Sequence, residues 1–179
     1  MQIDLIIILT AILFSVLFSG MEIAFVSTNK IFLEIEKKRK SVLSNILKKI
    51  TKKPSKFIIT MLVGNSIALV IYALFSGKLI LSYLYPEIDQ SLSVEFKYIF
   101  FQTLISSIFI IFTAEFLPKV LFQIYSNKIF KYLSLPAYFF FLMFSPISYL
   151  LDRISKRTLN KYIKTKEYEM GMVFSKDEL

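Results

Sequence analysis

The chain has 179 residues, 55% of them hydrophobic, and a formal net charge of +9 at pH 7. A mean hydropathy of +0.61 is too high for a soluble domain of this length and indicates a membrane protein with several spans. Cysteine and histidine are both absent, which excludes disulfides, thiol nucleophiles and thiolate or imidazole metal sites, so a bound metal must accept oxygen ligands.

Three apolar runs are long enough to cross a bilayer at about 1.5 Å per residue. They cover residues 3–26, 57–85 and 98–125. Asp4 is the only charge before Glu22, so the first run lacks the basic start of a cleaved signal peptide. We expect an all-α membrane protein with three transmembrane helices.

The loop between the first two spans reads KKRKSVLSNILKKITKKP, residues 37–54, and is dense in lysine. Apolar residues recur at helical spacing in and before it: Ile31, Ile35, Val42, Leu43, Ile46, Leu47 and Ile50. This pattern predicts an amphipathic helix on an anionic inner leaflet; a solvated basic linker is the weaker alternative. The net charge then indicates a bilayer surface as the partner, and no nucleic acid.

The charges of the loops predict the orientation. Residues 86–95, between the second and third spans, include acids and no basic residue. The positive-inside rule therefore places the N-terminus outside and the lysine-rich loop in the cytoplasm. We expect a multi-pass protein of a bacterial cytoplasmic (inner) membrane with a cytoplasmic C-terminus.

A fourth apolar run, residues 132–151, contains Pro136 and Pro146 and has basic flanks on both sides. If it crossed, the basic tail would be translocated against the rule. We expect a re-entrant or belt-like segment, with four crossings as the alternative. The transmembrane domain is then residues 1–151, followed by a basic cytoplasmic linker, residues 152–179.

Each span is interrupted by polar or helix-breaking residues. They are Ser15, Ser19 and Gly20 in the first, Gly64 and Asn65 in the second, and Glu115 and Pro118 in the third. Counted from same-side span ends near Ser27, Phe57 and Phe122, three polar residues lie roughly seven or eight residues inward, about 10–12 Å at helical rise: Ser19, Asn65 and Glu115. A shared depth predicts a shared site.

The chemistry of that site follows from Glu115. A carboxylate inside a bilayer costs about 2.5–3.5 kcal/mol on insertion scales, so it should face protein, water or a cation. Pro118 lacks an N–H and disturbs the carbonyl of Ala114. Hydroxyl, amide, carbonyl and carboxylate oxygens together favour Mg²⁺, Ca²⁺ or an alkali ion.

Each residue also has a structural interpretation. The serines can bond to carbonyls one turn back, and the glycines can serve helix packing. Glu115 and Lys119 can neutralise each other at i,i+4 spacing, Glu22 can be a solvated anchor, and Asn65 can bridge helices without an ion. Those interpretations do not explain the shared depth.

Three motifs occur in order: FSGMEIAF (residues 18–25), LVGNS (62–66) and EFLPK (115–119). Together they resemble the cyclin M / CorC family, also called haemolysin-related. The resemblance implies three spans plus a cytoplasmic-side belt helix, a homodimer, and Mg²⁺ export or homeostasis with Na⁺ as the coupling ion.

The resemblance also implies a binding site for dehydrated Mg²⁺. Its ligand candidates are Ser15, Ser19, Gly64, Asn65, Ser66 and Glu115, and its site-shaping candidates are Gly20, Glu22, Ala114, Pro118 and Lys119. Ser66 replaces a frequent second asparagine, Leu69 lies where another polar residue is common, and Ala114 replaces a glycine. These departures bear on affinity and on the Na⁺ coupling.

The family usually continues into a cytosolic region with a nucleotide-binding CBS pair, which this sequence does not include. Ser175 and Glu178 have the spacing of a capping box, so we expect a helix to begin there. The final KDEL is not expected to act as an ER signal on a cytoplasmic tail.

We expect a Mg²⁺ transporter. The alternative is a Mg²⁺-responsive regulator that conducts nothing. An enzyme is not expected, because no span carries paired aspartates and only a Ser–Lys arrangement remains for nucleophilic catalysis.

Overall fold

The computed structural model describes residues 2–84, 96–151 and 153–154. The elements in chain order are α1 (Gln2–Ser27), α2 (Lys30–Lys38), α3 (Val42–Thr51), α4 (Pro54–Leu84), α5 (Phe96–Ile110), the π-helical segment η1 (Ile111–Phe116), α6 (Leu117–Ile124), α7 (Ser126–Met143) and a short helix Ser145–Leu151. The acidic loop after α4, most of the basic linker and the capping box expected at Ser175 lie outside the described residues.

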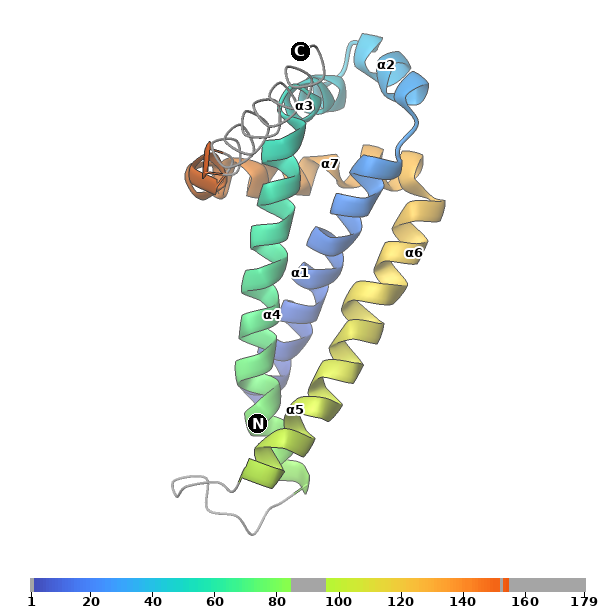
Figure 1. Cartoon of the computed structure of the whole chain (residues 1–179). Helices are drawn as coiled ribbons and strands as arrows, with labels where there is room; N and C mark the ends of the chain where they lie inside the picture. Colours follow the sequence, from blue (N-terminus) through green and yellow to red (C-terminus); the bar gives the residue numbers. More distant parts are fainter. Residues whose placement is uncertain (1, 85–95, 152, 155–179) are drawn as a thin grey trace, which may run out of the picture.

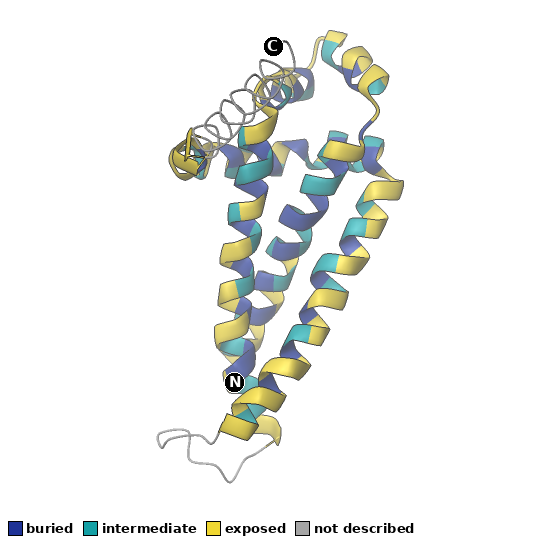
Figure 2. Cartoon of the chain, in the orientation of Figure 1, coloured by how far each residue is buried: buried dark blue, intermediate teal, exposed yellow. Residues whose placement is uncertain are grey.

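Three helices are long and apolar enough to cross a membrane: α1, α4, and the continuous helix α5–η1–α6, Phe96–Ile124. They run side by side as one bundle (Figure 1). Their outward faces are apolar, as at Leu13 and Val70, which are 67% and 59% exposed, and the exposed surface continues along all three spans (Figure 2). Such faces suit lipid rather than water, which confirms the three-span, all-α class.

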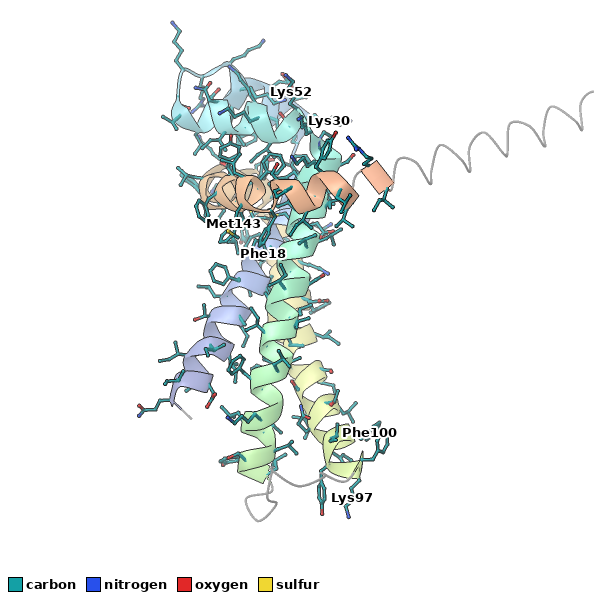
Figure 3. All side chains as sticks on the ribbon, turned by 90° about the vertical axis from the view of Figure 1, so that its left-hand side faces the viewer. Phe18, Lys30, Lys52, Lys97, Phe100 and Met143 are labelled. Carbon is teal, nitrogen blue, oxygen red and sulfur yellow. The ribbon has the colours of Figure 1, made fainter. Side chains whose placement is uncertain are left out.

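Helix α7 lies across one end of the bundle instead of along it (Figures 1 and 3). The chain then bends by 72° into the short helix Ser145–Leu151. This arrangement is the predicted belt, although it begins at Ser126 rather than at residue 132. Pro136 lies within α7 without ending it. The bend occurs at Phe144, two residues before Pro146, because a proline lacks the N–H and its ring disturbs the carbonyl four residues back.

The lysine-rich loop forms two helices, not one. Arg39 is extended after α2, and Ser41 caps α3 by accepting a hydrogen bond from Ser44 N–H at 3.1 Å. The hydroxyl of Ser44 donates to Lys37 O at 2.6 Å and closes the turn. Two capped helices are more stable here than one helix running through a serine cap.

Helices α2 and α3 pack partly on the rest of the protein. Leu47 and Ile50 are fully buried in one core cluster with Phe130 of α7. The α2 carboxylate of Glu36, 5% exposed, pairs with Lys131 of α7 at 3.1 Å. The buried part of the predicted amphipathic face therefore covers the belt helix, whereas Ile31, Ile35 and Val42 remain exposed.

Aromatic packing fixes the bundle beneath α7. The ring of Phe18 on α1 meets Phe140 of α7 edge to face at 5.0 Å between centroids, and Figure 3 shows Phe18 close to that helix. A Cβ added to Gly64 of α4 would lie 2.7 Å from the Phe18 ring. Glycine at this position lets α4 approach α1 closely, next to the polar residues of both helices.

Candidate cation site between the three spans

Ser15 of α1 and Asn65 of α4 meet between the two helices. Ser15 Oγ donates a hydrogen bond to Asn65 Oδ1 at 2.7 Å. Ser15 is fully buried and Asn65 is half-buried. The interpretation of Ser15 as a serine bonded to its own helix is therefore not what the structure shows, because its hydroxyl bonds across helices.

Ser19 lies one helical turn along α1 from Ser15, on the same face. It is fully buried, yet among the described residues its Oγ is the buried side-chain atom without any hydrogen-bond partner. An unsatisfied buried hydroxyl costs about 1–3 kcal/mol. Native proteins seldom retain such a group without a reason. This oxygen therefore marks a position where a bound ligand would supply the missing partner.

Glu115 lies in η1, where the third span widens to a π-helix. Leu117 N–H donates to Phe112 O, five residues back. Pro118 is buried just after this segment and has no N–H to donate, so one carbonyl loses its donor: that of Ala114 in the α-helical pattern or that of Thr113 in the π-helical pattern. The sequence predicts a helix broken at Pro118, whereas the structure shows a helix that is widened there and continues.

Three charges gather beside this segment. Lys119 Nζ of α6 lies 3.7 Å from Glu115 Oε2, with the two side chains 41% and 29% exposed. Both groups are within electrostatic range of the half-buried Glu22 carboxylate of α1. Glu22 thus belongs to the same group of ionisable side chains as Glu115 and Lys119.

The other sequence candidates have different places. Ser66 is exposed, and its Oγ donates to Leu62 O at 2.9 Å, so the structure does not bring it to the Ser15–Asn65 pair. Gly20 faces the ring of Phe122 on α6, which a Cβ would overlap. Ala114 is fully buried in a cluster with apolar residues of α1 and α4. Packing therefore accounts for Gly20, as it does for Gly64.

The donor set limits what the site can hold. Among the described residues, no three His, Cys, Asp or Glu side chains come together to hold a metal. A cation here would depend on hydroxyl, amide and carbonyl oxygens with one or two carboxylates. Such hard oxygen ligands suit Mg²⁺, Ca²⁺ or an alkali ion, and they do not suit softer metals.

A second polar network lies between α4 and α5, and sequence reasoning did not single it out. Tyr72 Oη donates to Ser106 O at 3.1 Å, and the hydroxyls of Ser76 and Ser106 lie 2.8 Å apart. Gln102 is buried one turn before Ser106. The i,i+4 spacing within each pair, Tyr72 with Ser76 and Gln102 with Ser106, was the available signal.

A family model described as the cyclin M transmembrane N-terminal domain matches residues 5–179. The match therefore includes the three spans, the belt helix and every site residue discussed above. Comparison with curated proteins gives no match.

Proposed function

The chain belongs to the cyclin M transmembrane N-terminal domain family, and from this premise we propose that it is a Mg²⁺ transporter. The family is associated with membrane Mg²⁺ transport and metal homeostasis. We propose export, with Na⁺ as the coupling ion and Mg²⁺ bound as cargo between the three spans. The observation that carries the proposal is the buried, unpartnered hydroxyl of Ser19.

The oxygen donors at a similar depth to Ser19 support this proposal. Ser15 and Asn65 supply a hydroxyl and an amide from α1 and α4, and Glu115 supplies a carboxylate from η1. The carbonyl left without a donor by Pro118 adds one backbone oxygen in the same segment. A mostly neutral set of this kind offsets the dehydration of a small divalent ion without building up repulsion between several carboxylates.

Binding would exchange internal partners for the ion. The hydrogen bond between Ser15 and Asn65 would open, so that both oxygens turn to the cation. The separation of 3.7 Å between Lys119 and Glu115 exceeds a good charge-assisted hydrogen bond, so little is lost when the ammonium withdraws. Lys119 then acts as a resident countercharge that Mg²⁺ displaces.

Orientation and assembly complete the proposal. The lysine-rich helices α2 and α3 and the belt α7 share one end of the bundle (Figure 1), and the positive-inside rule makes that end cytoplasmic. We place the chain in a bacterial inner membrane as a homodimer, linked to a cytosolic CBS-pair region.

Substitution of the charged ligand tests the site. Glu115→Gln keeps the shape of the side chain but removes its charge, so purified protein should lose its thermal stabilisation by Mg²⁺. The matched control is Ser66→Ala, whose hydroxyl already bonds within its own helix. An unchanged Mg²⁺ response in Glu115→Gln would show that the ion is not held there.

Flux separates transport from the alternative, a Mg²⁺-responsive regulator that conducts nothing. The purified chain in liposomes should move Mg²⁺ down its gradient, and an opposed Na⁺ gradient should speed that movement. Mg²⁺ binding with no flux under either gradient would favour the regulator. We propose no catalytic activity for the chain.

A further inference from the structure

The network between α4 and α5 lines a groove along the half of the bundle away from α7. The groove has a volume of about 620 Å³ and reaches from Lys78 at one end to Glu115 at the other. Its walls combine polar residues with apolar ones. The polar residues are Gln102, Thr103, Ser106 and Ser107, and the apolar ones include Leu69, Leu74, Leu81, Ile110 and Ile111. Polar and ionisable side chains inside a membrane face water or protein rather than lipid.

The walls of the groove are held together by specific contacts. The hydroxyls of Ser76 and Ser106 join α4 to α5, and Tyr72 bonds the backbone of Ser106. A Cβ added to Gly77 would lie 2.8 Å from the Gln102 amide nitrogen. Glycine there makes room for the amide between the helices, so the polar lining is built into the packing.

The groove is long enough to connect Glu115 with the outer face of the membrane. The hydrocarbon core of a bilayer is about 30 Å thick, and Glu115 lies nine residues before the end of its span at Ile124. That is about 14 Å at helical rise, which leaves about 16 Å to the outer face. The lining runs from Leu69 to Leu81 on α4, which is twelve residues or about 18 Å at helical rise. The groove therefore covers the remaining distance.

We propose that this groove is a water-filled passage that connects Glu115 with the outer face of the membrane and admits hydrated cations. The inference rests on the proposed function for its cargo and its orientation, and adds the outer route. Lys78 lines the outer mouth, where Asp4 of α1 is within electrostatic range.

Cysteine labelling tests the passage directly, because the natural chain contains no cysteine. Thr103→Cys and Ser107→Cys place a thiol in the groove with little change in volume. Leu104→Cys and Ile108→Cys are the matched controls, at nearly the same depth on α5 but outside the groove lining. Ile108 is 62% exposed on the bundle. If exposure alone decided the labelling rate, the control Ile108→Cys would therefore react at least as fast as the groove cysteines.

The probe is a positively charged, membrane-impermeant methanethiosulfonate applied to right-side-out vesicles. Only a thiolate reacts, and thiols ionise in water but not in lipid, so the groove cysteines should react at least about tenfold faster than the controls. Equal rates would overturn the passage. So would labelling confined to inside-out vesicles, which would place the mouth on the cytoplasmic side.

A second copy of the chain could instead cover the groove. In that case an oxidant would join Ser107→Cys into a disulfide-linked dimer and the thiol would resist the probe, which would also overturn the passage. The labelling needs no Mg²⁺. Unreactive groove cysteines in a protein that still binds Mg²⁺ would therefore reject the passage alone, whereas reactive cysteines without Mg²⁺ binding would reject the proposed function alone.

Discussion

Replacing Ser19 by alanine should have opposite effects with and without Mg²⁺. The hydroxyl is fully buried and unpartnered, so its removal relieves a penalty of about 1–3 kcal/mol and sacrifices little packing. We expect a net gain of about 1 kcal/mol in the free energy of unfolding without Mg²⁺. For a chain of this size, that raises the melting temperature by about 2–4 °C.

Mg²⁺ should stabilise Ser19→Ala less than it stabilises the parent protein, so the advantage of the variant disappears when Mg²⁺ is bound. At 100 times the dissociation constant, a ligand stabilises its protein by about 2.7 kcal/mol, and a tenfold loss of affinity at the same concentration reduces that to about 1.4 kcal/mol. The Mg²⁺-induced rise in melting temperature should therefore fall by about half in Ser19→Ala.

Ser15→Ala is the matched control within the same helix. Its hydroxyl bonds Asn65 at 2.7 Å, so alanine leaves that amide without its partner and should lower stability by about 1 kcal/mol without Mg²⁺. Thermal unfolding of the purified chain in detergent, scanned against Mg²⁺ concentration, measures both variants. A Ser19→Ala protein that is less stable without Mg²⁺, or that responds to Mg²⁺ like the parent, would refute the reasoning.

Three further substitutions test the surroundings of the site. Gly64→Ala places a methyl group 2.7 Å from the Phe18 ring and should destabilise the bundle by about 1–3 kcal/mol in thermal unfolding; a stable variant would show that α1 and α4 can separate there. Lys119→Gln removes the resident countercharge and should raise Mg²⁺ affinity about tenfold in a binding titration, whereas lower affinity would mean that the lysine positions a ligand. Glu36→Gln leaves the α7 lysine beside it without its charge partner and should cost about 1–3 kcal/mol, while Glu34→Gln, an exposed acid on the same helix, should leave the melting temperature unchanged. Equal effects of the two would contradict the pairing of α2 with the belt.

The spans and the belt could be predicted from the sequence because their signals are local. A run of apolar residues long enough to cross a bilayer is sufficient to predict a helix that crosses it, since an unpaired backbone is costly in lipid. The basic flanks of the fourth run predict a segment that stays on one side, and α7 lies across the bundle as that prediction requires. The common depth of Ser19, Asn65 and Glu115 likewise follows from counting residues along each span.

The rotation of each helix about its own axis could not be predicted, because it depends on packing between residues far apart in the chain. Packing turns the Ser66 hydroxyl outward although Asn65 beside it meets α1. It also brings Glu22 within range of Glu115 and Lys119. Composition and periodicity limit which residues lie in the membrane and at what depth, but the close approaches permitted by glycine and aromatic side chains decide which oxygens meet.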